Sequence, residues 1–402
     1  DKFQNLIPAA ITKAYPVIFA SPIHIQDPEA ASKSLSGILD ISKDKLLVML
    51  SRPNSEYELL MKKAPDNLVS KVRNLKLLGI YIDEEEGRFY PFKNLASQLL
   101  GFVGPSSEDS QSYGRYGLEF FYNDKLDGER GQLRGDRIID PIAGQDLNLT
   151  IDSNIQIRAE EILLNLTQKY KAESGMVIVQ EPKTGKILTL GNYPNFDPNN
   201  YSDYKIQSFL NPVIQSVYEP GSVMKVMTMS AGLDAGKFTP ETTIYDSGSL
   251  TLNGMTIKNW DKKAHGKVTM TEVVEQSINI GAAAAEKLIG NDLFYNYLVK
   301  FGFGKKTGLA LSGELVGNLN NLKNSFREIN FATAAFGQGI SVTPIQMINA
   351  VSAIANGGVL MKPYFIQDEQ PTVIRRVISE EAAHKVTKMM MSAVQKATIA
   401  QI

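Results

Sequence analysis

Cysteine is absent from the 402-residue sequence, and only three histidines and one tryptophan occur in it. The lack of cysteine excludes disulfide bonds, thiol catalysis and cysteine–zinc sites. The histidines, His24, His265 and His384, have no paired metal ligands near them in the sequence. This argues against a zinc site and against a Ser-His-Asp triad. The sequence therefore predicts neither a metal nor another cofactor.

Long apolar runs and an excess of one charge are also missing. No stretch of eighteen or more apolar residues occurs, so no transmembrane helix is predicted here, and no signal peptide is visible. The 42 basic and 43 acidic side chains nearly cancel, which gives no indication of a nucleic acid or an anionic membrane surface as partner. Because the sequence starts at Asp1, we expect a fragment, so a missing anchor does not argue for a soluble protein. The length suggests roughly two to three domains.

The segment Val217–Val226 combines a chain break with the start of a helix. Pro220 and Gly221 stand directly before Ser222, and an apolar-rich run follows, which is typical of a turn that enters a helix. Ser222 and Lys225 would share one helix face, so the amine could take the hydroxyl proton. The positive end of the helix dipole would favour the developing negative charge. An ordinary helix cap is the alternative interpretation.

The S-x-x-K pattern is weak on its own, because it occurs three times. The copies at residues 42–45 and 202–205 lie in polar surroundings, and we interpret both as solvated surface. Since histidine offers no obvious base, Lys225 remains the candidate base for Ser222. It could act at neutral pH only if its surroundings lower its pKa.

Residues 1–140 form a heterogeneous first part in which we find no catalytic motif. The short apolar runs Val17–Ala20 and Lys45–Leu50 are strand-like, and Glu56–Leu78 has helical spacing interrupted near Pro65. We interpret this part as a structural or docking module.

The pattern changes near Pro141. Residues Asp146–Ile151 alternate like a half-buried strand, and a capping box at 153–156 predicts a helix. The runs Met176–Val179 and Lys186–Leu190 predict a β-hairpin across a tight turn. Strand, helix, hairpin and the helix after Ser222 together indicate an α+β domain with an antiparallel sheet. The apolar positions with helical spacing after the capping box are Ile155, Ala159, Ile162, Leu163 and Leu166.

A further helix is predicted from Thr269, where Thr269 and Glu272 form a capping box. This helix breaks at Ser277-Ile278-Asn279. In an extended connection, Ser277 and Asn279 would point to the same side while Ile278 points into the core. An ordinary inter-helix connection is the alternative, because serine and asparagine are common there.

Taken in order, these motifs resemble those of the class B penicillin-binding proteins, the monofunctional peptidoglycan D,D-transpeptidases. Each motif is weak alone, but the ordered set covers nearly the whole chain. The matching residues are Tyr218–Lys225, Ser277–Asn279, Phe301–Gly308, Gly313-Glu314, Gly337–Gly339 with Thr343-Pro344, Leu149–Asp152, Tyr90-Pro91, Leu99–Gly104 and Gly117–Glu119.

The resemblance implies an α+β fold, with an antiparallel sheet covered by helices as in penicillin-binding and serine β-lactamase-like transpeptidase domains. This domain would span residues 141–402, truncated at its C-terminus, after an N-terminal mixed pedestal or dimerisation-type domain over residues 1–140.

The resemblance also implies the role of each site residue. Ser222 would attack the D-Ala-D-Ala bond of a donor stem peptide, with Lys225 as base and half of the oxyanion hole supplied by the Ser222 N–H. Ser277 would relay a proton to the leaving D-alanine, and Asn279 would hold Lys225 and the substrate amide. Residues Gly337, Gln338 and Gly339 would contribute to substrate binding.

The family's third motif, K-[ST]-G on a core strand, has no clear counterpart. Lys183-Thr184-Gly185 precedes Ser222, and Lys306-Thr307-Gly308 follows Ser277 closely and belongs to a glycine-rich loop. Lys396–Ile402 resembles the stretch that comes just before the motif strand. We therefore expect the third motif beyond Ile402.

The expected partners are donor and acceptor stem peptides, β-lactam antibiotics, a polytopic glycosyltransferase, and divisome or elongation-complex membrane proteins, but no nucleic acid. The resemblance implies an extracytoplasmic protein, anchored by an N-terminal helix outside this sequence, and the first part of the chain favours a septal role. The alternatives are a β-lactam-hydrolysing or β-lactam-sensing relative and a catalytically inactive scaffold of the cell-wall machinery.

Overall fold

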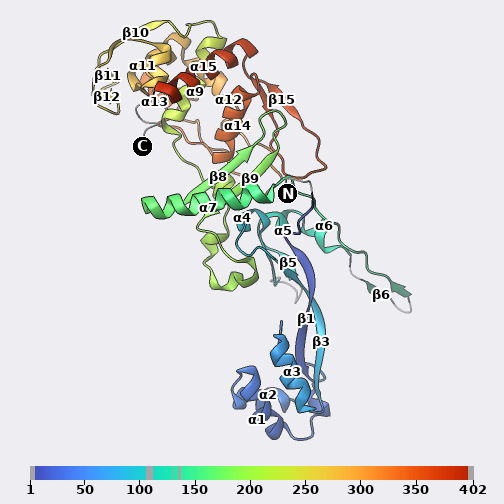
Figure 1. Cartoon of the computed structure of the whole chain (residues 1–402). Coiled ribbons are helices and arrows are strands. Elements are labelled where there is room, and N and C mark those ends of the chain that lie inside the picture. The colour runs from blue at the N-terminus through green and yellow to red at the C-terminus, as the bar shows by residue number, and fades with distance from the viewer. Residues whose placement is uncertain (1–4, 106–111, 130, 135–136, 397–402) are drawn as a thin grey trace. The chain divides into compact units, whose positions relative to one another are not determined.

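The computed structural model describes residues 5–105, 112–129, 131–134 and 137–396. It divides into two compact units, one of residues 8–92 and one that contains residues 93–402 together with the first seven. The mixture of helices and small antiparallel sheets confirms the predicted α+β class (Figure 1). The domain boundary near residue 140 stays a prediction.

The unit of residues 8–92 is a three-stranded antiparallel sheet in the order β2-β1-β3, packed against helices. Its core includes Ile18 of β1 and Leu35 of α1, both fully buried. Asp27 caps α1 by accepting the N–H groups of residues 29 and 30. The elements are β1 (Ile11–Ala20), η1 (Pro22–His24), α1 (Pro28–Leu39), α2 (Lys43–Leu50), β2 (Glu58–Met61), α3 (Asp66–Leu75) and β3 (Ile80–Phe89).

Two local predictions in this unit are wrong. The strand-like run Lys45–Leu50 belongs to helix α2, because Ser42 caps its first turn and the buried Leu46 and Leu50 lie four residues apart on one face. The first part of the helical prediction over Glu56–Leu78 is strand β2, which pairs with β1, whereas the part after Pro65 is helix α3 as predicted.

Residues 93–145 begin the second unit with short elements, and Phe102 and Tyr116 of this segment belong to an aromatic cluster. Phe102 stacks on Tyr201 with ring centroids 4.3 Å apart and meets Phe209 edge-on at 4.8 Å. Burial of these rings ties the segment to residues 196–209. The elements are α4 (Ser97–Leu100), β4 (Val103–Pro105), β5 (Ser112–Gly114), α5 (Gly117–Phe121), α6 (Asn123–Asp127), β6 (Gln132–Arg134) and β7 (Arg137–Ile139).

Helix α7 (Ser153–Tyr170) lies along the predicted hairpin of β8 (Gly175–Gln180) and β9 (Ile187–Tyr193) (Figure 1). The Gln156 side chain both accepts the N–H of Leu190 and donates to its carbonyl oxygen, at 2.9 and 2.8 Å. A side-chain amide thus takes the place of a neighbouring strand at this edge of β9.

Three details around α7 differ from the sequence prediction. The helix is capped by Asp152 and not by Ser153. Residues 146–151 form an irregular segment with one isolated bridge, from Leu149 to Ile366. The buried helix residues are Gln156, Leu163 and Thr167. Of the predicted stripe, the residues with exposed side chains are Ile155, Ile162 and Leu166.

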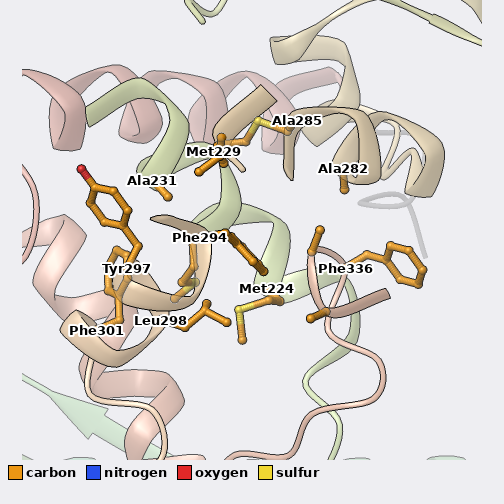
Figure 2. Close-up of a cluster of buried hydrophobic side chains, with 14 of the residues drawn as sticks. Met224, Met229, Ala231, Ala282, Ala285, Phe294, Tyr297, Leu298, Phe301 and Phe336 are labelled. Carbon is orange, nitrogen blue, oxygen red and sulfur yellow. The ribbon is translucent and has the colours of Figure 1, made fainter. Parts of the chain in front are cut away.

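The main hydrophobic core lies among the helices of the second unit. Figure 2 shows Met224 of α9, Phe294 and Leu298 of α12 and Phe336 within this cluster. The helices are α8 (Pro212–Gln215), α9 (Met224–Asp234), α10 (Met270–Glu275), α11 (Asn279–Ile289), α12 (Asn291–Lys300), α13 (Glu328–Ala334), α14 (Pro344–Ala355) and α15 (Glu380–Lys396), with η2 (Pro198–Asp203), η3 (Ile206–Phe209) and η4 (Gly221–Val223) as short 3₁₀ turns.

Short paired strands complete the second unit. The strands are β10 (Thr243–Asp246) with β13 (Gly266–Thr269), β11 (Ser249–Leu252) with β12 (Met255–Lys258), and β14 (Val359–Met361) with β15 (Val373–Arg376). The first two pairs lie between α9 and α10 in the sequence. They therefore connect the two helical segments that carry the candidate site residues.

Candidate functional site

Ser222 lies in the tight turn that opens helix α9. The 3₁₀ turn Gly221–Val223 runs directly into α9. Gly221 has a φ of +59°, which glycine adopts without a steric penalty. The predicted break followed by a helix is confirmed, and it leaves the Ser222 side chain exposed while the next helical residues turn inward.

Lys225 is buried one turn after this exposed serine, with 1% of its surface accessible. Its Nζ lies 3.1 Å from the Ser222 Oγ, 2.9 Å from the Ser277 Oγ and 2.6 Å from the Ser277 carbonyl oxygen. A fourth contact, 2.8 Å long, joins Nζ to the Oδ1 of Asn279. The structure thus brings Ser222, Lys225, Ser277 and Asn279 together around one nitrogen.

The nature of these four contacts suits a neutral amine. The Ser277 carbonyl and the Asn279 Oδ1 can only accept, so they use two N–H bonds. The rest of the nitrogen's surroundings are the hydroxyl groups of Ser222 and Ser277, which can donate as well as accept. Because the Ser277 hydroxyl donates its proton to the Ser222 Oγ, the lone pair of a neutral amine can accept the Ser222 hydroxyl proton.

Burial acts in the same direction on the protonation of this amine. Removal from water disfavours the charged form and lowers the pKa of Lys225 to about 7, from an ordinary value of 10.5. Near neutral pH a substantial fraction of the molecules then carries a lysine that can accept a proton.

Ser277 occupies the break between α10 and α11. Its φ of +55° is left-handed and ends the preceding helix. This turns both its carbonyl and its hydroxyl toward Lys225, and the hydroxyl donates to the Ser222 Oγ at 2.9 Å. The expected extended connection is therefore wrong for Ser277. Ser277 and Asn279 nevertheless face the same side, and Ile278 is fully buried.

Asn279 is the first residue of α11, and both ends of its side-chain amide are engaged. The Oδ1 accepts from Lys225, and the Nδ2 donates to the Lys258 carbonyl oxygen at 3.0 Å. The second contact fixes which end of the amide faces the lysine. Lys258 was not singled out from the sequence, because only its backbone is used.

Residues Gly337–Gly339 pack against the backbone of the serine turn. Gly221 donates its N–H to the Gly337 carbonyl at 3.1 Å, and Gly339 donates its N–H to the Glu219 Oε1 at 2.8 Å. A Cβ at Gly337 would collide with the Gly221 carbonyl oxygen, so this position requires glycine. Gln338 is exposed beside this turn. Glu219 was not predicted as a site residue, although its place in the Glu-Pro-Gly-Ser run was a signal in the sequence.

The two Lys-Thr-Gly tripeptides make other contacts. The Thr184 hydroxyl donates to Glu181 at 2.5 Å in the hairpin turn. The Thr307 N–H and hydroxyl both donate to the Glu314 Oε1 at 2.6 Å. Both threonines thus stabilise their own loops. The stretch Lys396–Ile402, except for Lys396, lies outside the described residues.

The histidines lie apart from these contacts. His24 is in η1 and contacts Ser21, His265 pairs with Asp261 at 3.2 Å, and His384 is on α15. Within the described ranges, no group of three or more histidine, aspartate or glutamate side chains is arranged to hold a metal ion. Over the same ranges, every helix is too short or too polar to cross a bilayer.

Two family descriptions match the chain. Residues 175–401 match the penicillin-binding protein transpeptidase domain, and residues 8–135 match the penicillin-binding protein dimerisation domain. The transpeptidase match includes Lys225 and the three residues that contact its amine.

Curated relatives and solved structures of penicillin-binding proteins and peptidoglycan-synthesis enzymes are also similar to this chain. Stage V sporulation protein D of Bacillus subtilis is 32% identical over 98% of this chain and 65% of its own length. Peptidoglycan D,D-transpeptidase FtsI of Escherichia coli is 30% identical over 96% of this chain and 67% of its own length. A peptidoglycan synthetase structure from Bifidobacterium adolescentis has a TM-score of 0.73 and 26% identity, covering 96% of this chain and 79% of that one. Penicillin-binding protein 2X of Streptococcus thermophilus, at 24% identity over 96% of this chain and 63% of its own, shares the fold with a TM-score of 0.76.

Proposed function

The chain belongs to the class B penicillin-binding proteins, and on this premise we propose that it carries the serine acyl-transfer centre of a peptidoglycan D,D-transpeptidase. The observation that supports the proposal best is the surroundings of the Lys225 amine. A buried lysine contacts the hydroxyl of an exposed serine, a second serine and an asparagine. This is the arrangement that activates a hydroxyl nucleophile without histidine.

In the proposed acylation step, the Ser222 Oγ attacks the carbonyl carbon of the D-Ala-D-Ala bond of a donor stem peptide. Its proton passes to neutral Lys225, over the 3.1 Å contact or through the Ser277 hydroxyl. The C–N bond then breaks, and the departing D-alanine amine receives a proton through Ser277. The product is an ester between the donor peptide and Ser222.

In the proposed second step, an acceptor amine from another peptidoglycan strand attacks this ester. A new amide bond forms, the Ser222–carbonyl bond breaks, and the Ser222 oxygen regains its proton. The Ser222 N–H lies in the first turn of a helical segment, where N–H groups have no helical partner. It would stabilise the oxyanion, a contribution worth about 3 kcal/mol per donor.

Asn279 and the loop of residues 337–339 have supporting roles in this proposal. Asn279 would hold Lys225 with its Oδ1 and meet the substrate amide as it enters. Gly337 is hydrogen-bonded to the serine turn through Gly221, and Gln338 beside it is exposed. This loop would therefore line the substrate site.

The biological setting is proposed from the relatives. The protein would act outside the cytoplasm, anchored by an N-terminal helix, and serve septal wall synthesis with a polytopic glycosyltransferase and other division or elongation membrane proteins. β-Lactams, which resemble D-Ala-D-Ala, would acylate Ser222. The FtsI relative's name and the two family matches support peptidoglycan as the substrate and penicillin-type compounds as ligands.

Intact-mass measurement after exposure to penicillin tests the proposal. The full-length protein is the appropriate material, because this chain spans 65% of the Bacillus relative. We expect one covalent adduct that forms rapidly and is released slowly, and no adduct with Ser222→Ala. An adduct that persists in Ser222→Ala would refute the nucleophile. Rapid turnover would indicate a hydrolase, and unchanged biological function of Ser222→Ala would indicate a scaffold.

A further inference from the structure

Asp246, at the end of β10, is a fully buried carboxylate that is held by neutral donors. Its Oδ1 accepts the Gly248 N–H at 2.8 Å. Its Oδ2 accepts the His265 N–H at 3.0 Å and the Asn259 Nδ2 at 2.7 Å. Burial of a carboxylate is costly unless such hydrogen bonds compensate it. Gly248 belongs to the local turn, whereas the backbone N–H of His265 and the Asn259 side chain come from later segments of the chain.

Asn259 follows β12 and is 2% exposed, with both ends of its side-chain amide in use. Its Nδ2 donates to Asp246 and to the Lys263 carbonyl at 2.9 Å, and its Oδ1 accepts the Ile280 N–H at 3.1 Å. Because the Asp246 carboxylate can only accept, it requires the Nδ2 end. The Asp246 carboxylate, together with the Lys263 carbonyl, therefore turns the Asn259 oxygen toward α11.

The Ile280 N–H is one of the first-turn N–H groups that a helix leaves without a partner. Ile278, the residue before α11, supplies no side-chain cap. Asn259 therefore caps α11 from a different segment of the chain. The neighbouring Lys258 carbonyl simultaneously holds the Asn279 Nδ2 at 3.0 Å. Residues 258 and 259 thus fix both the backbone and the side chain at the start of α11.

We propose that Asp246 and Asn259 act as a pair of positioning residues that keep the Asn279 Oδ1 directed at the Lys225 Nζ. Neither touches the reacting atoms. Asp246 orients Asn259, Asn259 holds the first turn of α11, and Asn279 then presents its oxygen to the lysine at 2.8 Å. A rotated Asn279 would instead present an N–H donor to the amine. This inference rests on the proposed function, because it assigns the pair a part in acylation of Ser222.

Exchanging the aspartate and the asparagine between positions 246 and 259 tests this role. In Asn259→Asp, the residue still accepts from Ile280 but has no donor for Asp246, and two carboxylates face each other. In the double variant Asp246→Asn with Asn259→Asp, residue 246 can donate to residue 259, which still accepts from Ile280. The link to α11 is then restored, although the backbone N–H of His265 and the Lys263 carbonyl each lose a partner.

The measurement is the acylation of full-length protein by a fluorescent penicillin over a range of concentrations, with near-UV circular dichroism to verify folding. For Asn259→Asp we expect a fall of about thirtyfold in the limiting acylation rate, with the half-saturating concentration within twofold of the parent. The double variant should recover about tenfold. Thr251→Val is the matched control. It removes the exposed 2.9 Å contact to Thr256 in the same segment and should acylate at the parent rate.

A folded Asn259→Asp that acylates at the parent rate would overturn the proposal. If Asn259→Asp does not fold, the double variant decides: a folded protein with a rate within about tenfold of the parent supports the pair, and a slower or unfolded protein overturns it. Slow acylation in Thr251→Val would show that any change in the segment of β11 and β12 slows acylation. This result would also overturn the proposal. If the parent forms no Ser222 adduct, the proposed function itself fails, which is a distinct result.

Discussion

Two helix starts in this chain share the S-x-x-K pattern, and their surroundings differ almost completely. At the start of α2, Ser42 accepts the Lys45 N–H at 3.4 Å as an ordinary cap, and the Lys45 side chain is exposed. At the start of α9, the Lys225 side chain is 1% exposed and contacts the Ser222 hydroxyl directly. The four-residue pattern is the same, but only one copy joins the two side chains.

The difference arises from what each helix packs against. Leu46 and Leu50 bury one face of α2 and leave Lys45 on the other. Helix α9 is buried along most of its length, so Lys225 cannot reach solvent and must use the groups of α11. Burial of α9 in the core thus places the lysine of a common cap pattern where its pKa is lowered.

The largest expected effect is on the acylation rate, and it should distinguish Lys225 from Lys45. Lys225→Met should slow acylation by fluorescent penicillin by at least about a hundredfold, because a general base contributes about 10²–10⁴-fold. Lys45→Met should acylate at the parent rate. Lys225→Met should fold, since methionine is apolar and removes a buried amine whose protonation favours unfolding. Equal rates in the two variants would contradict the distinction between the sites.

An effect of intermediate size should appear in the pH dependence. The pKa of Lys225 is lowered by burial to about 7, so the amine is neutral above and charged below this pH. Acylation needs the neutral form, so its rate should rise with pH through 7 and then level off. At pH 5 it should be about a hundredfold below the plateau. Stopped-flow acylation between pH 5 and 9 tests this; a rate that is flat below pH 7 would count against Lys225 as base.

The smallest expected effect belongs to the other helix start. Ser42→Ala removes the cap of α2 and should lower the free energy of unfolding by about 1 kcal/mol. Urea unfolding followed by circular dichroism measures this change. Penicillin acylation of the folded variant should match the parent, because Ser42 serves only its own helix. Slower acylation would show that the two helix starts are not independent.

Much of the site could be predicted from the sequence, because its signals are local. Pro220 and Gly221 mark the turn before Ser222, and the break at Ser277–Asn279 follows a helix whose predicted capping box is present. The contacts that tune the amine are not local. They depend on the packing of α9 against α11. In the sequence, these two helices are separated by two small sheets and α10.

The wrong or missing local predictions concern features that a short stretch of sequence does not determine. Helical spacing predicted α7 but not which of its faces packs on the hairpin, so Ile155, Ile162 and Leu166 of the predicted stripe are exposed. The apolar run in α2 was too short to distinguish a strand from a helix. Asp246 and Asn259 carried no sequence signal, because their partners lie in other segments.

The Gln156 amide has a consequence for how the molecule behaves among other copies of itself. A strand edge with free backbone groups can accept a strand from another molecule, which is a common route to aggregation. At Leu190, on the edge of β9, both backbone groups are already occupied by the Gln156 side chain. The buried Gln156 side chain thereby prevents another strand from pairing with β9 at this position.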